Sequence, residues 1–458
     1  MQTLLFFSPP EAPTLTPQTH EMPAKSLPGH ALSGSIAAPG DKSVSHRALI
    51  LAALASGESR ITGLLESADV LATARAVAAL GAGVHRDGEG WRVVGTNGRF
   101  RSPDRALDLG NSGTGVRLLM GAVAGTGATA DFTGDASLSS RPMARVLDPL
   151  TAMGADCTST GGRLPVRITG GPLRPVDWSP EIASAQVKSA ILLAALGAQG
   201  ETIVREPAPT RDHTERMLPL FGGRVETDGL AVRLSGPQAL IGTRIDLPGD
   251  PSSAAFALVA GLIVPGSAVT LTGVIANPAR DGLYRVLERM GAKLTRTPGR
   301  AMAGEETVDL SVETSALRGV DLEADIAPSM IDEYPILAVA AAFAGGESRF
   351  RGLAELRAKE SDRLAGTAAL LAANGVAARI EGDDLIVSGL GPAGVPGGGK
   401  VVTHGDHRLA MAGLVMGCAA REAVRIDDAA MIATSYPGFI DDMRALGAQI
   451  ECENRETA

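Results

Sequence analysis

The sequence predicts an α/β fold of two lobes, each built from three similar units, so that six repeats make up the chain. Three observations predict this fold. Glycines end six amphipathic segments at nearly regular spacing, six further helical segments are apolar on every side, and a Pro-Gly-Asp turn precedes a buried helix twice, at Gly40 and at Gly249. Such self-similarity is typical of repeated structural units.

The first observation concerns the places where helical patterns stop. Segments such as "AVAALGAGV" and "VLERMGAKL" end at a glycine, the residue that most easily takes the left-handed conformation just past a helix. One such glycine means little, but recurrence after roughly 70 residues implies a tandem unit of about that length. The six glycines are Gly81, Gly154, Gly222, Gly291, Gly375 and Gly447.

A second helix in each unit is expected to be buried. These segments are dominated by Ala, Leu, Val, Ile and Met around their whole circumference, and helices of that kind lie in a core. Between the helices, short β-branched segments such as "ETIVRE" and "AVRIDDA" predict strands. Each unit therefore runs strand, helix, strand, helix and further strands. The buried helices start near Ser45, Gly113, Ser184, Ser252, Ile331 and Asp406.

The starts of these buried helices carry cations that capping does not explain. Ser, Thr, Asp and Asn are ordinary N-cap residues, but Lys42, Arg47 and Arg408 stand beside them, although the positive end of the helix dipole disfavours cations. A bound anion would relieve the conflict, because helix N-termini bind phosphate and carboxylate groups. We therefore expect a ligand with such groups in a cleft between the two lobes.

Composition excludes several classes of protein. The 458 residues carry a net charge of −9 and 3% aromatic residues, which argues against a nucleic-acid binder. The three cysteines lack metal-ligand spacing, so the sequence predicts neither a disulfide framework nor a metal site and favours a reducing, cytoplasmic location. The longest apolar runs are about a dozen residues, short of the roughly 20 that a membrane span needs, so no membrane association is expected.

The N-terminal segment differs from the rest of the chain. Residues 1–30 are rich in Pro and Thr, lack periodicity, and have neither the basic residues of a signal peptide nor the Arg-rich pattern of a transit peptide. We expect a disordered extension there, and Met22 is an alternative start.

Two charged motifs have both a structural and a functional interpretation. The structural interpretation is a solvated helix edge with weak ion pairs, and the functional one is part of an anion-binding site. The motifs are "LRAKESDRL" at residues 356–364 and "PTRDHTERM" at residues 209–217. Arg141, just before Pro142, fits a surface arginine as well as an anion clamp. Only the combination of motifs changes this balance. The histidines near these motifs favour structural roles: His46, His213 and His407.

Ten motifs in order resemble those of the 5-enolpyruvylshikimate-3-phosphate synthase family. The resemblance runs from about Ser33 to Ile450, nearly the whole chain. It implies an enolpyruvyl transferase fold with three βαβαββ units in each lobe, residues 41–249 forming one lobe and residues 31–40 plus 250–458 the other, joined by a two-strand hinge. The motifs are "PGDKSVSHR", "GNSGTGVRL", "GDASLSSRPM", "SAQVKSAILLA", "TRDHTERM", "PGDPSSAAF", "SMIDEYP", "LRAKESDRL", "GDHRLAM" and "ATSYPGF".

The resemblance implies a transferase of the shikimate pathway, which leads to chorismate and the aromatic amino acids. It would transfer the enolpyruvyl group of phosphoenolpyruvate to the 5-hydroxyl of shikimate 3-phosphate and release phosphate, as a monomer, without cofactor or metal. By the family pattern, the residues that bind shikimate 3-phosphate are Lys42, Ser43, Arg47, Ser184, Ala185, Gln186, Arg211, Asp332 and Lys359. Those that bind phosphoenolpyruvate are Lys42, Gly113, Arg141, Gln186, Arg363 and Arg408.

This reaction needs two groups that handle protons. A proton must reach the methylene carbon of phosphoenolpyruvate while the hydroxyl attacks the neighbouring carbon, and it must leave again as phosphate departs. Two carboxylates in different environments suit these tasks. Asp332 would be the base toward the 5-hydroxyl, and Glu360 the acid and then the base at the methylene. Lys42 would act with them by offsetting the accumulated negative charge.

Two positions bear on inhibitor binding. Thr434 in "ATSYP" stands where many family members place a lysine that binds phosphoenolpyruvate. "SAQVKS" and "MIDEYP" are similar to the class associated with tolerance to glyphosate, an inhibitor of the phosphoenolpyruvate site. Gly113, however, stands where an alanine methyl would crowd that inhibitor.

Two other functions stay open. UDP-N-acetylglucosamine enolpyruvyl transferase shares the fold but usually relies on a loop cysteine, and none of Cys157, Cys418 and Cys452 stands beside an anion motif. A noncatalytic phospholigand-binding module would need no reactive carboxylates, whereas Asp332 and Glu360 are both present.

Overall fold

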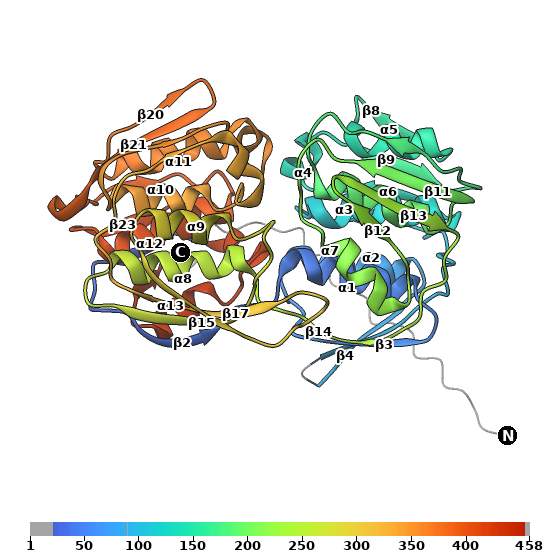
Figure 1. Ribbon diagram of the computed structural model, residues 1–458, viewed down its shortest axis with the longest axis horizontal. Coiled ribbons are helices and arrows are strands. Elements are labelled where there is room, and N and C mark those ends of the chain that lie inside the picture. Colours follow the sequence, from blue (N-terminus) through green and yellow to red (C-terminus); the bar gives the residue numbers. More distant parts are fainter. Residues whose placement is uncertain (1–21, 89, 454–458) are drawn as a thin grey trace, which may run out of the picture.

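In the described part of the chain, six four-stranded sheets carry the fold, three in each of two lobes that stand side by side (Figure 1). The computed structural model describes residues 22–88 and 90–453. One edge strand of each sheet runs parallel to its neighbour and the remaining pairs are antiparallel, as in the order β6-β7-β9-β8. The predicted fold class, with repeated βαβαββ units, is confirmed.

The chain starts with two strands of the second lobe, β1 and β2, runs through the whole first lobe and then completes the second. The first lobe contains α1 (Lys42–Leu54), β3 (Glu58–Thr62), α2 (Ala68–Ala79), β4 (Gly83–Asp87), β5 (Gly90–Val94), β6 (Leu107–Asp108), α3 (Gly113–Thr126), β7 (Thr129–Thr133), α4 (Ala136–Ser140), α5 (Ala144–Met153), β8 (Asp156–Thr160), β9 (Arg163–Thr169), β10 (Asp177–Trp178), α6 (Ala185–Ala195), β11 (Gly200–Arg205), α7 (His213–Met217), β12 (Glu226–Asp228), β13 (Ala231–Gly236) and β14 (Arg244–Asp246). The second contains β1 (Ala24–Leu27), β2 (Ser33–Ala37), α8 (Pro251–Ile263), β15 (Ala268–Ile275), α9 (Gly282–Arg289), β16 (Lys293–Pro298), β17 (Thr307–Glu313), β18 (Asp321–Leu322), α10 (Tyr334–Ala342), β19 (Gly345–Phe350), α11 (Arg363–Ala373), β20 (Ala378–Glu381), β21 (Asp384–Leu390), β22 (Lys400–Val401), α12 (His407–Ala419), β23 (Val424–Ile426), α13 (Phe439–Ala445) and β24 (Gln449–Cys452).

Two strands are exchanged where the chain passes between the lobes. β2 precedes α1 in sequence but pairs with β15 of the second lobe, and β14 precedes α8 but pairs with β3 of the first lobe. The two crossing segments lie together: the amide of Asp41 donates to the carbonyl of Pro248 at 2.8 Å, and the amide of Asp250 donates to Pro39 at 2.8 Å. The two Pro-Gly-Asp turns therefore form a paired connection between the lobes.

One segment differs from the expected N-terminal extension. Residues 24–27 form β1, which lies between β23 and β24 and is antiparallel to both. The strand is short and flanked by Pro23 and Pro28, and its partners lie about 400 residues further along the chain, so no local pattern indicates it. The predicted disordered extension, residues 1–30, is therefore wrong for residues 24–27. Its first part, residues 1–21, lies outside the described residues.

The predicted helix pattern is confirmed. All six buried helices are present as α1, α3, α6, α8, α10 and α12, and each is followed along the chain by the amphipathic helix of its unit. The third amphipathic helix, α7, is short and continues as a 3₁₀ turn over residues 218–221. The six glycines that follow have φ between +78° and +111°, the left-handed region expected of helix caps: Gly81, Gly154, Gly222, Gly291, Gly375 and Gly447.

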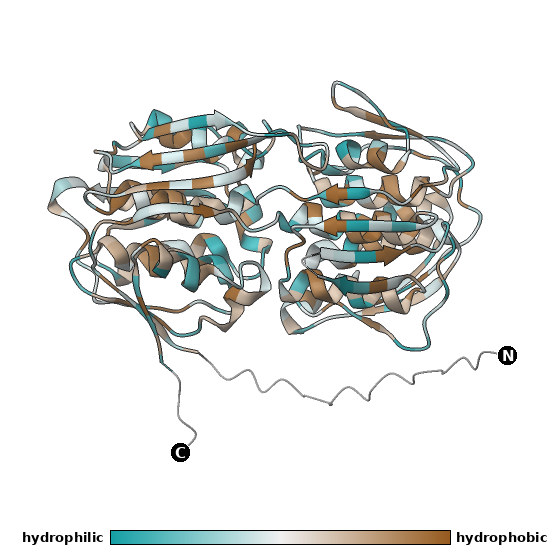
Figure 2. Cartoon of the chain, turned by 90° about the horizontal axis from the view of Figure 1, so that it is seen from below, coloured by the Kyte–Doolittle hydropathy of each residue, from teal (hydrophilic) through white to brown (hydrophobic). Residues whose placement is uncertain are grey.

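Each lobe has its own hydrophobic core around three buried helices. In the first lobe α3 and α6 approach so closely that a Cβ at Gly121 would overlap the carbonyl oxygen of Ala190. Hydrophobic and hydrophilic residues alternate along several outer strands (Figure 2), as expected where one face of a sheet covers a core. Among the described residues, every helix is too short or too polar to span a lipid bilayer.

Candidate active site

The starts of the buried helices from both lobes meet at one cleft of about 370 Å³. Lys42 lies at the start of α1, Gly113 at the start of α3 and Gln186 at the start of α6, and from the second lobe Ser252 of α8 and Arg408 of α12 face them. Most residues predicted for the site line this cleft: Lys42, Ser43, Gly113, Arg141, Ser184, Ala185, Gln186, Arg211, Asp332, Lys359, Glu360 and Arg408.

The helix starts are capped by the chain itself. Asp41 Oδ1 accepts from the amide of Val44 at 2.7 Å, and Asp406 Oδ1 accepts from the amide of Arg408 at 2.9 Å. Side-chain N-caps of this kind begin five of the six buried helices, at Asp41, Ser112, Ser184, Asp250 and Asp406, whereas α10 begins at Glu333 without one. The anion-binding capacity of the cleft consequently rests on the cationic side chains beside the caps as well as on the helix ends.

Asp332 lies among cations from both lobes. Its Oδ2 accepts from Arg211 Nη2 of the first lobe at 2.7 Å, while Lys359 Nζ lies 3.3 Å and Arg363 Nη1 3.1 Å from Oδ1. Burial alone would raise the pKa of this carboxyl, but the cations, Lys359 and Arg211 above all, hold it well below the usual range. Asp332 is therefore ionised, and it lines the cleft.

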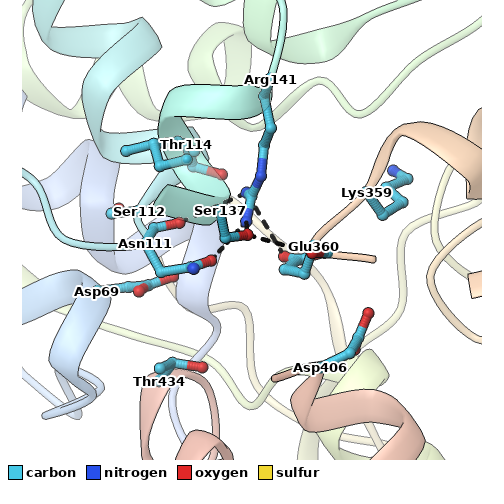
Figure 3. Close-up of polar contacts among 12 residues, drawn as sticks. Asp69, Asn111, Ser112, Thr114, Ser137, Arg141, Lys359, Glu360, Asp406 and Thr434 are labelled. Carbon is cyan, nitrogen blue, oxygen red and sulfur yellow. Dashed lines mark hydrogen bonds and ion pairs between the residues drawn. The ribbon is translucent and has the colours of Figure 1, made fainter. Parts of the chain in front are cut away.

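Glu360 is the second carboxylate of the cleft and faces Arg141 of the other lobe (Figure 3). Its Oε1 lies 3.9 Å from Arg141 Nη1, its Oε2 accepts from Arg363, and its backbone carbonyl accepts from Ser137 at 3.2 Å. Burial opposes ionisation, yet Arg363 and Arg141 hold the pKa of Glu360 well below its usual value. The two lobes are thus in contact at this point.

Several cleft residues were not singled out from the sequence. Asp69 at the start of α2 accepts from Lys42, with Oδ2 2.5 Å from Nζ. Arg117 on α3 donates to Gln186 Oε1 at 2.8 Å, and burial lowers its pKa to about 10. A single arginine inside the apolar helix "GVRLLMGAVAG" was the signal that could have identified it. No comparable signal exists for Asp69, because its partner depends on how α1 and α2 pack.

Two predicted substrate residues lie behind the cleft wall. Arg47 is 3% exposed and donates to Ser189 Oγ at 2.6 Å and to Thr214 Oγ1 at 2.8 Å. Arg363 is 1% exposed and binds Asp406 at 2.8 Å in addition to the two carboxylates of the cleft. The guanidinium groups of Arg47 and Arg363 both bind protein partners. Neither residue lines the cleft that the described residues form.

The two charged motifs each divide between surface and site. In "LRAKESDRL", Arg357 and Asp362 form an exposed pair at 3.3 Å, whereas Lys359 and Glu360 face the cleft. In "PTRDHTERM", Arg211 reaches the cleft while His213 is fully buried. The structural and functional interpretations therefore both hold, for different residues of the same motif.

A group of metal-binding residue types lies between the lobes. Donor atoms of Asp212, His213 and Glu305 lie within 4.8 Å of one another. Each already has a protein partner: Glu305 binds His213 Nδ1 at 2.7 Å and Arg216 at 3.4 Å, and His213 Nε2 faces Arg280 at 3.0 Å. The nearby guanidinium groups make this a hydrogen-bonded network between the lobes.

The sequence matches one protein family over most of its length. A family model described as EPSP synthase (3-phosphoshikimate 1-carboxyvinyltransferase) matches residues 27–443. The chain belongs to the EPSP synthase family. A relative from Maricaulis maris, a 3-phosphoshikimate 1-carboxyvinyltransferase, is 60% identical over 432 residues, covering 93% of this chain and 97% of the relative. Another of that name from Methylorubrum extorquens is 56% identical, covering 94% and 97%.

Solved structures agree with this assignment. An EPSP synthase from Acinetobacter baumannii superposes with a TM-score of 0.85 at 41% identity, covering 94% of this chain and all of that one, 100%. The enolpyruvyl transferase NikO from Streptomyces tendae gives a TM-score of 0.76 at 20% identity, covering 95% and 100%, and shows the shared fold alone.

Thr434, the position of the absent family lysine, lies beside a cleft histidine. Its Oγ1 is 3.4 Å from His407 Nδ1 and donates to the carbonyl of Met431 at 2.7 Å. Burial and Lys42 lower the pKa of His407, so this imidazole is neutral and does not replace the lysine charge. The cations that contact Glu360 are both arginines: Arg363 donates to Oε2 from behind the cleft wall, and Arg141 Nη1 lies 3.9 Å from Oε1.

Proposed function

We propose that this cleft carries out the EPSP synthase reaction, the transfer of the enolpyruvyl group of phosphoenolpyruvate to the 5-hydroxyl of shikimate 3-phosphate with release of phosphate. The enzyme is a transferase of the shikimate pathway and of aromatic amino acid biosynthesis. The observation that carries the proposal is the pair Asp332 and Glu360, two ionised carboxylates in one cleft rich in guanidinium and ammonium groups from both lobes.

The substrates divide the cleft between them in this proposal. Shikimate 3-phosphate takes the side formed by the start of α6, Arg211 and Lys359, with Asp332 at its 5-hydroxyl. Phosphoenolpyruvate takes the side formed by Gly113, Arg141 and Arg408. Two buried nitrogens on that side have no hydrogen-bond partner among the described residues. Arg141 Nε can donate to a ligand, and His407 Nε2 can donate or accept according to its tautomer. Lys42 and Gln186 lie where both substrates can reach them.

The proton movements follow from the two carboxylates. Asp332 accepts the proton of the 5-hydroxyl as its oxygen bonds to the central carbon of phosphoenolpyruvate, and Glu360 gives a proton to the methylene carbon. Glu360 then takes a proton back from that carbon as the carbon–oxygen bond to phosphate breaks, which restores the double bond and leaves the product enol ether. The proton held by Asp332 leaves with the departing phosphate. Cations placed before the reaction stabilise the negative charge that accumulates on the way.

Ligand binding changes the proton affinity of Glu360 in this scheme. Its low pKa depends on Arg363 and Arg141, acting against burial. Phosphate and carboxylate groups bound at Arg141 add negative charge beside Glu360, so its pKa rises and it can hold the proton that it must give.

We also propose how the enzyme is organised. Residues 41–249 act as one body, and residues 31–40 with 250–458, together with β1, act as the other. The two are joined at the paired crossing segments, and contacts such as that of Arg141 with Glu360 close the cleft around the substrates. The enzyme works as a monomer in the cytoplasm, with no cofactor or metal.

The test is an acceptor comparison. The purified chain is incubated with phosphoenolpyruvate and either shikimate 3-phosphate or UDP-N-acetylglucosamine, and released phosphate is measured. We expect release with shikimate 3-phosphate alone. Release with the nucleotide sugar instead would identify the other transferase, and calorimetric binding of shikimate 3-phosphate without any turnover would identify a binding module.

A further inference from the structure

Lys188 is a buried charged residue that the proposed reaction does not use. It lies on α6, is 1% exposed, and its Nζ is 2.7 Å from Glu206 Oε2 and 2.7 Å from Glu215 Oε1. Both carboxylates are buried as well, each residue being 8% exposed. Burying one cation with two anions has a large desolvation cost and is a poor way to stabilise a core. The buried group of Lys188, Glu206 and Glu215 is therefore expected to have a role other than stabilising the core.

The two carboxylates stand at the two ends of one short segment. Glu206 directly follows β11, Glu215 belongs to α7, and residues 207–212 between them form neither helix nor strand. Glu206 also accepts a hydrogen bond from the hydroxyl of Thr210, in the middle of the segment. The ammonium group of Lys188 on helix α6 therefore holds both ends of the segment. Glu206, at one of these ends, also holds Thr210 in the middle of the segment.

The segment carries Arg211, which reaches from the first lobe to the second. Its Nη2 lies 2.7 Å from Asp332 Oδ2, and Arg211 lines the cleft. A long side chain on an irregular segment loses much conformational freedom when it is held in one place. Fixing the backbone beneath it reduces that cost and keeps the guanidinium in register with Asp332.

We propose that Lys188 is a positioning residue for the reaction: through Glu206 and Glu215 it fixes residues 207–214 so that Arg211 stays on Asp332 and in the shikimate 3-phosphate part of the cleft. The inference rests on the proposed function for its kinetic consequences. Its structural content, that the ammonium holds the segment carrying Arg211, can be tested without turnover.

Two variants separate positioning from charge balance. Lys188→Met leaves two buried carboxylates without their cation, so we expect a lowered Tm. The triple variant Lys188→Met/Glu206→Gln/Glu215→Gln removes the unpaired charges as well, so we expect its Tm to recover toward wild type. Positioning is lost in both, because amide groups do not replace the two ion pairs. Lys25→Met is the matched control, since Lys25 pairs with Glu451 at 2.8 Å on the sheet of β1.

Kinetics give the first readout. In the triple variant we expect the KM for shikimate 3-phosphate to rise by about tenfold to a hundredfold, with a smaller change for phosphoenolpyruvate. The acid limb of the kcat/KM profile should move to higher pH. Burial raises the pKa of Asp332, and Lys359 and Arg211 lower it. When Arg211 is displaced, this pKa rises, so the base loses its proton only at a higher pH. If Lys188 were only a core residue, its variants would change Tm, but the KM for shikimate 3-phosphate and the acid limb would stay as in Lys25→Met.

Trypsin gives a readout that needs neither ligand nor turnover. Trypsin cleaves after arginine, and Arg211 is held inside the segment in question. We expect cleavage after Arg211, followed by mass spectrometry under native conditions, to be faster in both Lys188 variants than in wild type and Lys25→Met. Unchanged cleavage, or a folded triple variant with wild-type KM and acid limb, would overturn the inference. Absence of phosphate release by the wild type would instead overturn the proposed function, and the cleavage rates would still decide the role of Lys188.

Discussion

Asp41 and Asp250, the N-caps of the first buried helix in each lobe, share the guanidinium group of Arg280. Arg280 Nη1 lies 3.0 Å from Asp41 Oδ2, and Nη2 lies 3.0 Å from Asp250 Oδ1. All three side chains are buried. The two aspartates belong to the repeated Pro-Gly-Asp turns, so one arginine joins the lobes at the point where the chain crosses between them.

Replacing this arginine should destabilise the protein strongly. Arg280→Gln leaves two buried carboxylates without their cation, and we expect the free energy of unfolding to fall by about 3–5 kcal/mol. Urea denaturation followed by circular dichroism measures the change. Arg285→Gln is the control, because Arg285 pairs with Asp281 at 3.0 Å but is 51% exposed in its side chain, and such surface pairs contribute about 0.2–1 kcal/mol. Equal losses in the two variants would contradict the role given to Arg280.

Removing the acid at the methylene carbon should abolish most turnover and spare binding. Glu360→Gln keeps the shape of the side chain but cannot give or take the proton, and we expect kcat to fall by about 10²–10⁴. The Kd for shikimate 3-phosphate, measured by calorimetry, should change little. Glu381→Gln on the exposed strand β20 provides the control. A variant that retained wild-type phosphate release would show that another group delivers the proton.

Binding at the phosphoenolpyruvate side should be coupled to proton uptake. In the free enzyme Arg363 and Arg141, against the effect of burial, hold the pKa of Glu360 well below its usual value, so the carboxyl carries no proton near pH 7. An anionic ligand that engages Arg141 raises that pKa, so binding should take up as much as about one proton.

Calorimetry in two buffers of different ionisation enthalpy measures this uptake. Shikimate 3-phosphate is added first and glyphosate second, at pH 7. We expect the wild type to take up more protons than Glu360→Gln in the second step. Identical uptake by both proteins would mean that Glu360 does not change its protonation state on binding.

A methyl group at position 113 should discriminate between ligands. A Cβ there would lie 3.0 Å from Arg141 Nη1 and 3.1 Å from Arg117 Nη1, closer than most side-chain contacts allow. We expect Gly113→Ala to weaken glyphosate by about tenfold or more, and phosphoenolpyruvate less. Steady-state inhibition gives both constants. Gly171→Ala is the control, because a Cβ there meets nothing within 4 Å, and equal loss of both ligands in Gly113→Ala would refute the prediction.

The repeats and their caps were predictable because they depend on local geometry. The amphipathic helices α9 and α13 end just before Gly291 and Gly447 because these glycines take a positive φ. A helix such as α8 is buried because apolar residues surround its axis. Both properties can be read within about a dozen residues. The cations beside the helix starts were visible in the same way. Lys42 and Arg408 meet in one cleft, whereas Arg47 lies behind its wall.

Other features depend on pairing between distant parts of the chain. β1 lies between strands about 400 residues away, Lys42 meets Asp69, and Arg211 crosses to Asp332, and none of these partners follows from spacing along the sequence. The sequence by itself determined six repeated units with cationic helix starts, because helix periodicity and capping are short-range. Only the tertiary structure decided which charges pair across the lobes, because the energy of a charge depends on the burial and the neighbours that docking creates.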